Sequence, residues 1–102
     1  MSERLTDLAA QPHILLAAVD AERNIRRSYV ITRSQDLFGW HLVMWAWGRL
    51  NGQLTQRTSA FADEQAAISF IRQLLARRAT APGRIGVCYR SLLAQAADLQ
   101  RP

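Results

Sequence analysis

The sequence predicts an α+β fold, in which a single antiparallel β-sheet of about four to five strands carries one main α-helix on one face. Three observations favour it. Runs rich in β-branched and aromatic residues come early in the chain, Asn51-Gly52 separates two of them, and one helical pattern follows. One sheet covered on one face by one helix is the simplest way to bury this pattern.

The strands are expected in the first two thirds of the chain. His13–Asp20 is an apolar run of strand length, and Ser28–Arg33 is rich in β-branched and aromatic residues. Trp40–Leu50 and Gln53–Phe61 flank Asn51-Gly52, a strong hairpin signal because both central residues of a type I′ turn need positive φ. This pattern predicts four consecutive antiparallel strands.

The main helix is expected over roughly Asp63–Arg78. Asp63 can accept hydrogen bonds from the exposed amides at the helix start, and Pro82-Gly83 should end whatever helix remains. Residues 86–90 can add a short edge strand, and the turn carboxylates Asp20, Glu22 and Asp36 should bond to nearby backbone amides.

Length and composition indicate one small domain. The chain has 102 residues, of which 49% are hydrophobic, and its longest apolar stretch is far below the roughly 18 residues of a membrane span. We expect a tail or short helix over 1–12, the domain proper over 13–90, and a helical turn or tail over 91–102. Cys88 is the only cysteine, which favours a reducing, cytoplasmic setting, and we expect its side chain to be a small buried hydrophobe.

The charge balance favours a polyanionic partner. Thirteen basic residues face eight acidic ones, the formal net charge is +5, and every basic residue is arginine. Arginine contacts phosphate bidentately and stacks on bases. Codon bias also explains the missing lysine, and a charge of +5 is common in proteins that bind no nucleic acid. Charge alone leaves both interpretations open.

No catalytic or metal-binding constellation is visible. His13 and His41 lie on different predicted strands without suitably spaced ligands, so we expect structural or surface histidines. Residues 83–86 form a glycine-containing loop that lacks the Lys-Ser/Thr pair of a nucleotide-phosphate loop. We therefore expect a non-enzymatic protein with no metal and no cofactor, no small-molecule substrate and no membrane partner.

All three tryptophans fall between positions 40 and 47. A two-residue turn at Asn51-Gly52 would pair Trp47 with Gln56 and Trp45 with Thr58, leaving both indoles on the wetter face and Leu42, Met44 and Ala46 with Phe61 under the helix. There the indoles would stand near Arg49 and Arg57, a combination suited to bases and phosphates. Alternatively, both tryptophans are core residues, and a single bulge would invert the faces.

The same segment resembles a known family. The series Asp36-Leu-Phe-Gly, Trp40-x-Leu-Val, Trp47-Gly48-Arg49 and Gly52-Gln53 is similar to the WGR domain, named for its Trp-Gly-Arg signature. Upstream, Val19-Asp20 and residues 23–29 resemble the entry segment of small bacterial members. The resemblance covers about residues 14 to 90 and implies an antiparallel sheet with one packed helix.

The resemblance also implies a function. WGR domains occur in eukaryotic poly(ADP-ribose) polymerases, where they are non-catalytic, bind DNA at breaks and relay that binding to neighbouring domains. Carried over, Trp47 becomes the DNA-stacking residue and Arg49 a phosphate or partner contact. The chain departs from the family at Asn51, where glycine is common, and at Trp45, where bacterial members often carry a basic residue. It is too short for a polymerase catalytic domain, so no ADP-ribosyl transfer is expected.

Two functional hypotheses follow. The first is a DNA-binding module, with Trp47 and Trp45 stacking and Arg49 and Arg57 engaging phosphate, and with ends or nicks among its candidate targets. The second is a protein-interaction or homodimerisation module, with Trp45 and Trp47 in an apolar interface rimmed by arginines.

Overall fold

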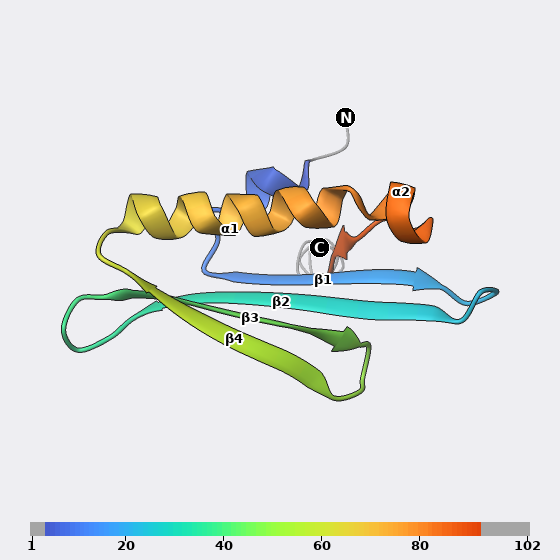
Figure 1. The fold of residues 1–102 in the computed structure, drawn as a ribbon, viewed down its shortest axis with the longest axis horizontal. Helices are drawn as coiled ribbons and strands as arrows, with labels where there is room; N and C mark the ends of the chain where they lie inside the picture. The colour runs from blue at the N-terminus through green and yellow to red at the C-terminus, as the bar shows by residue number, and fades with distance from the viewer. Residues whose placement is uncertain (1–3, 93–102) are drawn as a thin grey trace, which may run out of the picture.

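The computed structural model describes residues 4–92, which form one sheet beneath a layer of helices (Figure 1). The strands are β1 (His13–Asp20), β2 (Ile25–Gln35), β3 (His41–Arg49), β4 (Leu54–Phe61) and β5 (Arg90–Ser91). The helices are the 3-10 helix η1 (Leu5–Leu8), the main helix α1 (Glu64–Ala79) and the short α2 (Ala81–Ile85).

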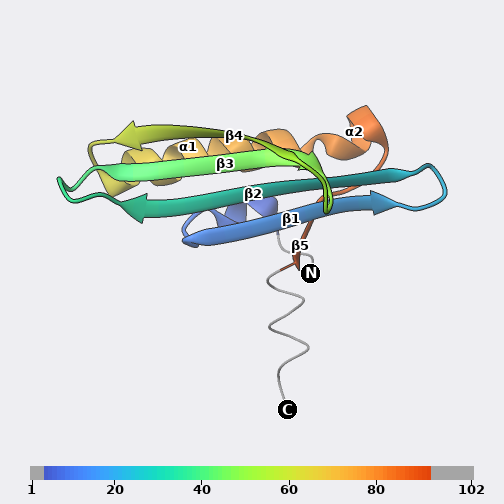
Figure 2. The same cartoon turned by 90° about the horizontal axis from the view of Figure 1, so that it is seen from below.

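The sheet has five strands in the order β4-β3-β2-β1-β5, and every neighbouring pair is antiparallel. α1 runs along one face of it, whereas the view from below shows the other face without a helix among the described residues (Figure 2). The predicted α+β architecture is therefore confirmed. β2 is longer at both ends than the predicted strand over Ser28–Arg33.

The main helix begins and packs as the sequence indicates. The Asp63 side chain accepts a hydrogen bond from the Ala66 amide at 2.8 Å, which caps the helix start. Ala67, Ile71 and Leu75, at helical spacing, are buried against the sheet. In the described part of the chain, no helix is long and apolar enough to cross a membrane.

The core lies between the helices and one face of the sheet. The strands contribute Ile14, Leu16, Ile31 and Val43, each almost fully buried. Partly buried side chains that extend this core are Leu5, Trp45, Trp47, Phe61, Ile68, Phe70, Leu74, Ile85 and Val87. Trp45 and Trp47 therefore both pack on the face of the sheet that α1 covers.

The predicted register of the β3–β4 hairpin is wrong by one residue. Trp47 pairs with Thr55 and Trp45 with Arg57, because a four-residue connection, residues 50–53, replaces the two-residue turn. Asn51 has the expected positive φ of 64°, but Gly52 does not, so the turn is not type I′. A slip of one residue exchanges the two faces of a strand.

The face assignment is consequently reversed. Trp45 and Trp47 join Phe61 beneath α1, and Leu42, Met44 and Ala46 lie on the face that no described helix covers. The alternative, in which Trp45 and Trp47 are core residues, therefore describes the structure better than the prediction that both indoles lie on the solvent-exposed face.

The segment after α1 also differs from the expectation. Pro82 does not end the helical structure but stands in the first turn of α2, where its missing amide hydrogen is not needed. The edge strand is only Arg90–Ser91, paired with β1. Cys88 is exposed rather than buried, because the side chains of this extended segment alternate and Tyr89 takes the inward position. A helical turn or tail was predicted over residues 91–102, and residues 93–102 of that range lie outside the described residues.

Two turn carboxylates behave as predicted. The Asp36 side chain accepts hydrogen bonds from the amides of Phe38 and Trp40, both at 2.9 Å. Asp20 accepts from the Arg23 amide at 3.4 Å and forms an ion pair with its guanidinium at 2.6 Å. These contacts fix the β1–β2 and β2–β3 connections.

The Asp20 contact gives a pH-dependent prediction. The hydrogen bond from the Arg23 side chain lowers the pKa of Asp20, against a smaller opposing effect of burial. The contact therefore stabilises the hairpin above the ordinary aspartate pKa and is lost as pH falls through the lowered one. Carboxyl-carbon NMR titration should give an Asp20 midpoint below the ordinary aspartate range, and Arg23→Ala should return it. An unchanged midpoint in that variant would contradict the contact.

Candidate nucleic-acid interface

The Trp-Gly-Arg segment lies at the end of β3, beside the start of β2. In the antiparallel register, Trp47 is opposite Tyr29 and Arg49 is opposite Arg27. The side chains of all four therefore lie on the helix side of the sheet, in two neighbouring rows. Two arginines directly opposite each other repel, and this arrangement favours a site that binds an anion.

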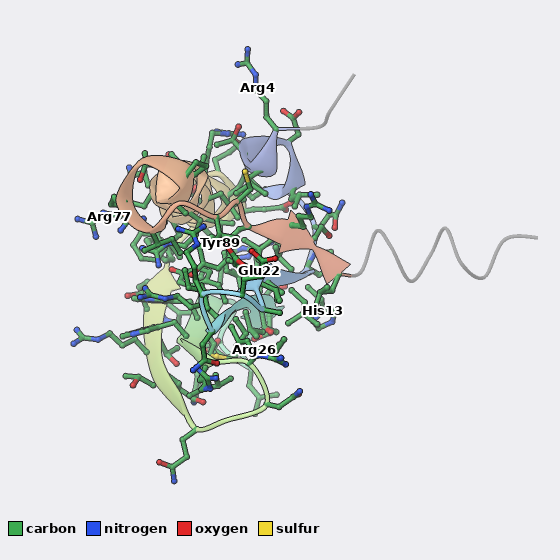
Figure 3. The ribbon with its side chains drawn as sticks, turned by 90° about the vertical axis from the view of Figure 1, so that its right-hand side faces the viewer. Arg4, His13, Glu22, Arg26, Arg77 and Tyr89 are labelled. Carbon is green, nitrogen blue, oxygen red and sulfur yellow. The ribbon has the colours of Figure 1, made fainter. Side chains whose placement is uncertain are left out.

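A pocket of about 370 Å³ opens at this end of the sheet. Trp47 forms part of its wall, and four arginines line it: Arg26, Arg27, Arg49 and Arg78. No carboxylate is among its lining residues. Figure 3 looks at this end of the molecule, with Arg26 near the hairpin ends and Tyr89 between the sheet and the helices. The pocket therefore combines an aromatic ring with uncompensated positive charge.

Arg49 is exposed and held in place by one neutral contact. Its Nη2 donates to the Asn24 side-chain oxygen at 2.7 Å. Asn24 can take this position because it occupies the left-handed region, with φ of 55°, in the β1–β2 turn. Since an amide oxygen does not neutralise a guanidinium, Arg49 keeps its charge for a partner.

Arg78 connects the end of α1 to this pocket. Its guanidinium carbon lies 4.6 Å from the centre of the Tyr29 ring, a cation–π geometry. Its Nε is buried without a hydrogen-bond partner. Burial raises the pKa of Tyr29, although the charge of Arg78 partly opposes the rise, so the ring beneath the guanidinium stays neutral at neutral pH.

Trp45 and Arg57 occupy different environments from Trp47 and Arg49. Trp45 packs edge-to-face on Phe70 of α1, with ring centres 5.1 Å apart, and is therefore held beneath the helix. Arg57 is exposed on β4, directly opposite Trp45. The sequence predicted all four residues on one solvent-exposed face of the sheet, whereas the structure brings only Trp47 and Arg49 together in the basic pocket.

Gly48, between the two signature residues, is required by close packing. A Cβ added there would lie 2.5 Å from the Gln53 carbonyl oxygen and 3.3 Å from the Leu54 Cα. Both neighbours are backbone atoms, which cannot move aside as a side chain can. The residue between Trp47 and Arg49 must therefore lack a side chain for the β3–β4 connection to close.

Several pocket residues were not recognised in the sequence. Arg27, Arg78 and Asn24 come from three other segments, and only strand pairing and the helix end bring them to Trp47. The available signal is the two arginine doublets, Arg26-Arg27 and Arg77-Arg78, although positive charge is also favourable at the C-terminal end of a helix, which explains the second doublet equally well. Within residues 4–92, no group of three or more His, Cys, Asp or Glu side chains could hold a metal ion.

Comparison with protein families identifies the domain. A family model described as the WGR domain matches residues 13–81, which is more than half of the chain. The chain belongs to the WGR domain family. Its match ends just after α1 and includes all of β1 to β4. WGR domains are in general nucleic-acid-binding modules and are not catalytic. No curated protein and no solved structure matched this chain.

Proposed function

We propose that this WGR domain binds DNA non-catalytically, with a preference for ends or nicks, through the pocket at the end of β3. The proposal rests on one observation: the half-buried Trp47 ring lies on the same face as Arg27 and Arg49 in a pocket that Arg78 also lines and no carboxylate lines. A site of this composition suits a ligand that offers both a flat apolar surface and negative charge.

The position of Trp47 supports the preference for ends. In an intact duplex both faces of each interior base are already stacked, so an indole finds a free base face only at an end or a nick. The packing of Trp47 against the core fixes the ring, which reduces the entropy lost on binding. Stacking of this kind contributes about 1–3 kcal/mol per base.

The arginines supply attraction that does not depend on sequence. Arg49 and Arg27 stand beside the indole, where a phosphate next to the stacked nucleotide would lie, and the exposed Arg57 extends the positive surface along β4. Trp45 acts indirectly in this proposal, because its contact with Phe70 braces the neighbouring part of β3 under the helix.

Binding is expected to be strongly salt-dependent. Each phosphate neutralised on duplex DNA contributes about −0.9 to the slope of log affinity against log salt, so contacts from Arg27, Arg49 and Arg78 should give a slope near −3. Fluorescence anisotropy with labelled blunt-ended, nicked and hairpin-closed duplexes of equal length, at several salt concentrations, measures this slope. The blunt-ended and nicked forms should bind more tightly than the closed form.

Two outcomes would count against the proposal. Absence of salt-dependent binding to any of the three duplexes would exclude DNA as the partner. Equal affinity of wild type and Trp47→Ala, with both shown to be folded by circular dichroism, would retain DNA binding but remove the assigned stacking residue. An apolar homodimer interface formed by both tryptophans has less support, since Trp45 lies beneath α1.

A further inference from the structure

The connection between β2 and β3 exposes large apolar side chains. Leu37 is 99% exposed, Phe38 is 87% exposed and the nearby Trp40 is 47% exposed. We call Leu37 and Phe38 the apolar tip. A single exposed leucine is unremarkable, but adjacent large apolar side chains almost wholly in solvent are typical of a binding element.

The apolar tip is held in one conformation by hydrogen bonds from the side chains and backbone of the residues on either side of it. The Asp36 side chain accepts hydrogen bonds from Phe38 and Trp40, the Gly39 amide donates to the Asp36 carbonyl at 3.2 Å, and Gln35 Nε2 donates to the Gly39 carbonyl at 3.2 Å. Gly39 permits this turn because its φ is 87°. A rigid loop loses little entropy on binding, so its exposed side chains are available as anchors.

The tip lies at the end of the sheet away from the basic pocket, and its surroundings are acidic. α1 begins at the same end (Figure 1), so Asp63 and Glu64 stand there together with Asp36. Arg33 is paired with Glu64 at 3.6 Å. This environment disfavours a nucleic acid or an anionic membrane as the partner of the tip and favours an apolar pocket rimmed by positive charge.

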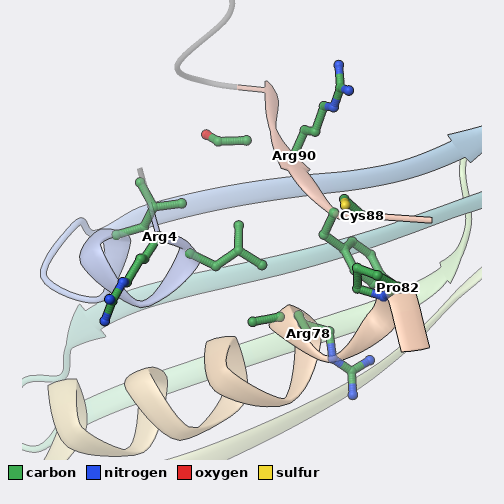
Figure 4. A pocket seen from close by; sticks show the side chains of 10 residues that line it. Arg4, Arg78, Pro82, Cys88 and Arg90 are labelled. Carbon is green, nitrogen blue, oxygen red and sulfur yellow. The ribbon is translucent and has the colours of Figure 1, made fainter. Parts of the chain in front are cut away.

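The chain itself contains such a pocket, which adjoins the one at Trp47 through Arg78 and Tyr89. It has a volume of about 420 Å³ and lies between η1, the start of α2 and the segment before β5. Leu5, Leu8, Pro82 and Tyr89 give it an apolar lining, and no carboxylate is among its lining residues. Arg4 and Arg90 stand on two sides of it, as Figure 4 shows. We call this the η1 pocket.

We propose that the apolar tip of one copy inserts into the η1 pocket of a second copy. The two surfaces match in character, since the tip is apolar with carboxylates nearby, whereas the pocket is apolar and carries Arg4, Arg78 and Arg90. Its volume falls within the range of sites that enclose a compact apolar group. Because the tip is fixed by the hairpin of its own copy, it reaches another molecule rather than folding back.

The tip and the pocket lie on different parts of the surface, and this determines which assemblies are open to the protein. Two copies can exchange tips reciprocally in a closed two-fold dimer, or copies can join head to tail into rings or short chains. This self-association uses neither Trp47 nor Arg49, although Arg78 and Tyr89 line both pockets. It is therefore tested without DNA, and the failure of either proposal leaves the other standing.

Self-association should depend on Phe38. Sedimentation velocity of the DNA-free protein over a range of concentrations should show species larger than a monomer, and Phe38→Ser should weaken the association at least about tenfold. Leu54→Ser is the matched control, because Leu54 is also an exposed large apolar residue, at 44%, but lies on β4 away from the tip. A wild type that stays monomeric, or a Phe38→Ser variant that associates equally well, overturns the proposal.

Cys88 gives a readout at the pocket itself. It is the only cysteine in the chain, it is exposed, and it lines the η1 pocket. Its rate of reaction with an aromatic disulfide reagent should fall as wild-type concentration rises and should stay constant for Phe38→Ser. A wild-type rate that is independent of concentration, while larger species are present, places the contact elsewhere and overturns the assignment of the pocket.

A mixing experiment separates the two halves of the contact. Phe38→Ser retains the pocket, and the double variant R4E/R90E retains the tip, so neither should associate alone. Mixed together, they should form a one-to-one complex that grows no further, because only one tip and one pocket remain intact. Failure of the mixture to associate, when both variants are folded and wild type does associate, contradicts the complementary contact.

Discussion

Arg49→Glu is expected to weaken DNA binding about 100-fold at low salt, which corresponds to about 2.7 kcal/mol. The substitution removes one guanidinium contact and places a carboxylate opposite Arg27, in the same pocket. There it would form an ion pair with an arginine that otherwise faces phosphate, so a single change affects two cations. The slope of log affinity against log salt should shrink by about one to two.

The matched control is Arg72→Glu. It makes the same change in net charge at an exposed position of α1 that lines none of the pockets described above. Anisotropy titrations at two salt concentrations should show only a small loss for this variant, through the general field of the protein. Equal losses for the two variants would mean that net charge, rather than the Trp47 pocket, governs binding.

The fold could be predicted because its main signals are local. The β-branched and aromatic runs place the strands, and Asp63 followed by apolar residues at helical spacing places α1 within one residue of its observed start. The turn carboxylate Asp36 was recognised for the same reason, since its hydrogen bonds reach only two and four residues along the chain.

The hairpin register could not be predicted from Asn51-Gly52 alone. The Leu50 amide donates to the Arg26 carbonyl at 2.9 Å, which ties the connection to β2 rather than to β4. The Gly52 amide then donates to the Arg49 carbonyl across a turn that places Asn51 at the positive φ. A long-range contact with a third strand thus decides the register, and the dipeptide contains no information about it.

The residues of the candidate site also fall into two groups: those that the local sequence identifies and those that only long-range contacts bring to the site. Trp47 and Arg49 could be singled out because they are neighbours in a recognisable segment. Arg27 and Arg78 could not, since their nearness to Trp47 depends on the β2–β3 pairing and on where α1 ends over the sheet. Trp45 and Trp47 are both half-buried, but Trp45 contacts Phe70 of α1 whereas Trp47 lines the basic pocket.

The spacing of the Trp-Gly-Arg segment has a direct structural explanation. Residues two apart on a strand point to the same face, so Trp47 and Arg49 necessarily stand side by side. The intervening residue points to the opposite face, where the Gln53 backbone crosses so closely that only glycine fits. The same three residues therefore contribute both to the pocket and to the close packing of the β3–β4 connection.

Gly48→Ala is accordingly expected to destabilise the domain by about 2–3 kcal/mol, since overpacking against backbone forces the connection to shift. For a domain of this size, such a loss lowers Tm by about 10–20 °C. Gly83→Ala is the control, because a Cβ added at Gly83 meets nothing within 4 Å. Thermal unfolding followed by circular dichroism should leave the control close to wild type.

The same variant also tests whether the turn positions the pocket. Any backbone shift at Gly48 moves Trp47 and Arg49 relative to Arg27, so DNA affinity measured well below the lowered Tm should fall even though the protein remains folded. A Gly48→Ala protein with wild-type stability would show that the 2.5 Å approach relaxes without cost. A destabilised protein with wild-type affinity would show instead that glycine serves folding alone, and that the geometry of Trp47 and Arg49 is fixed by their packing on β2.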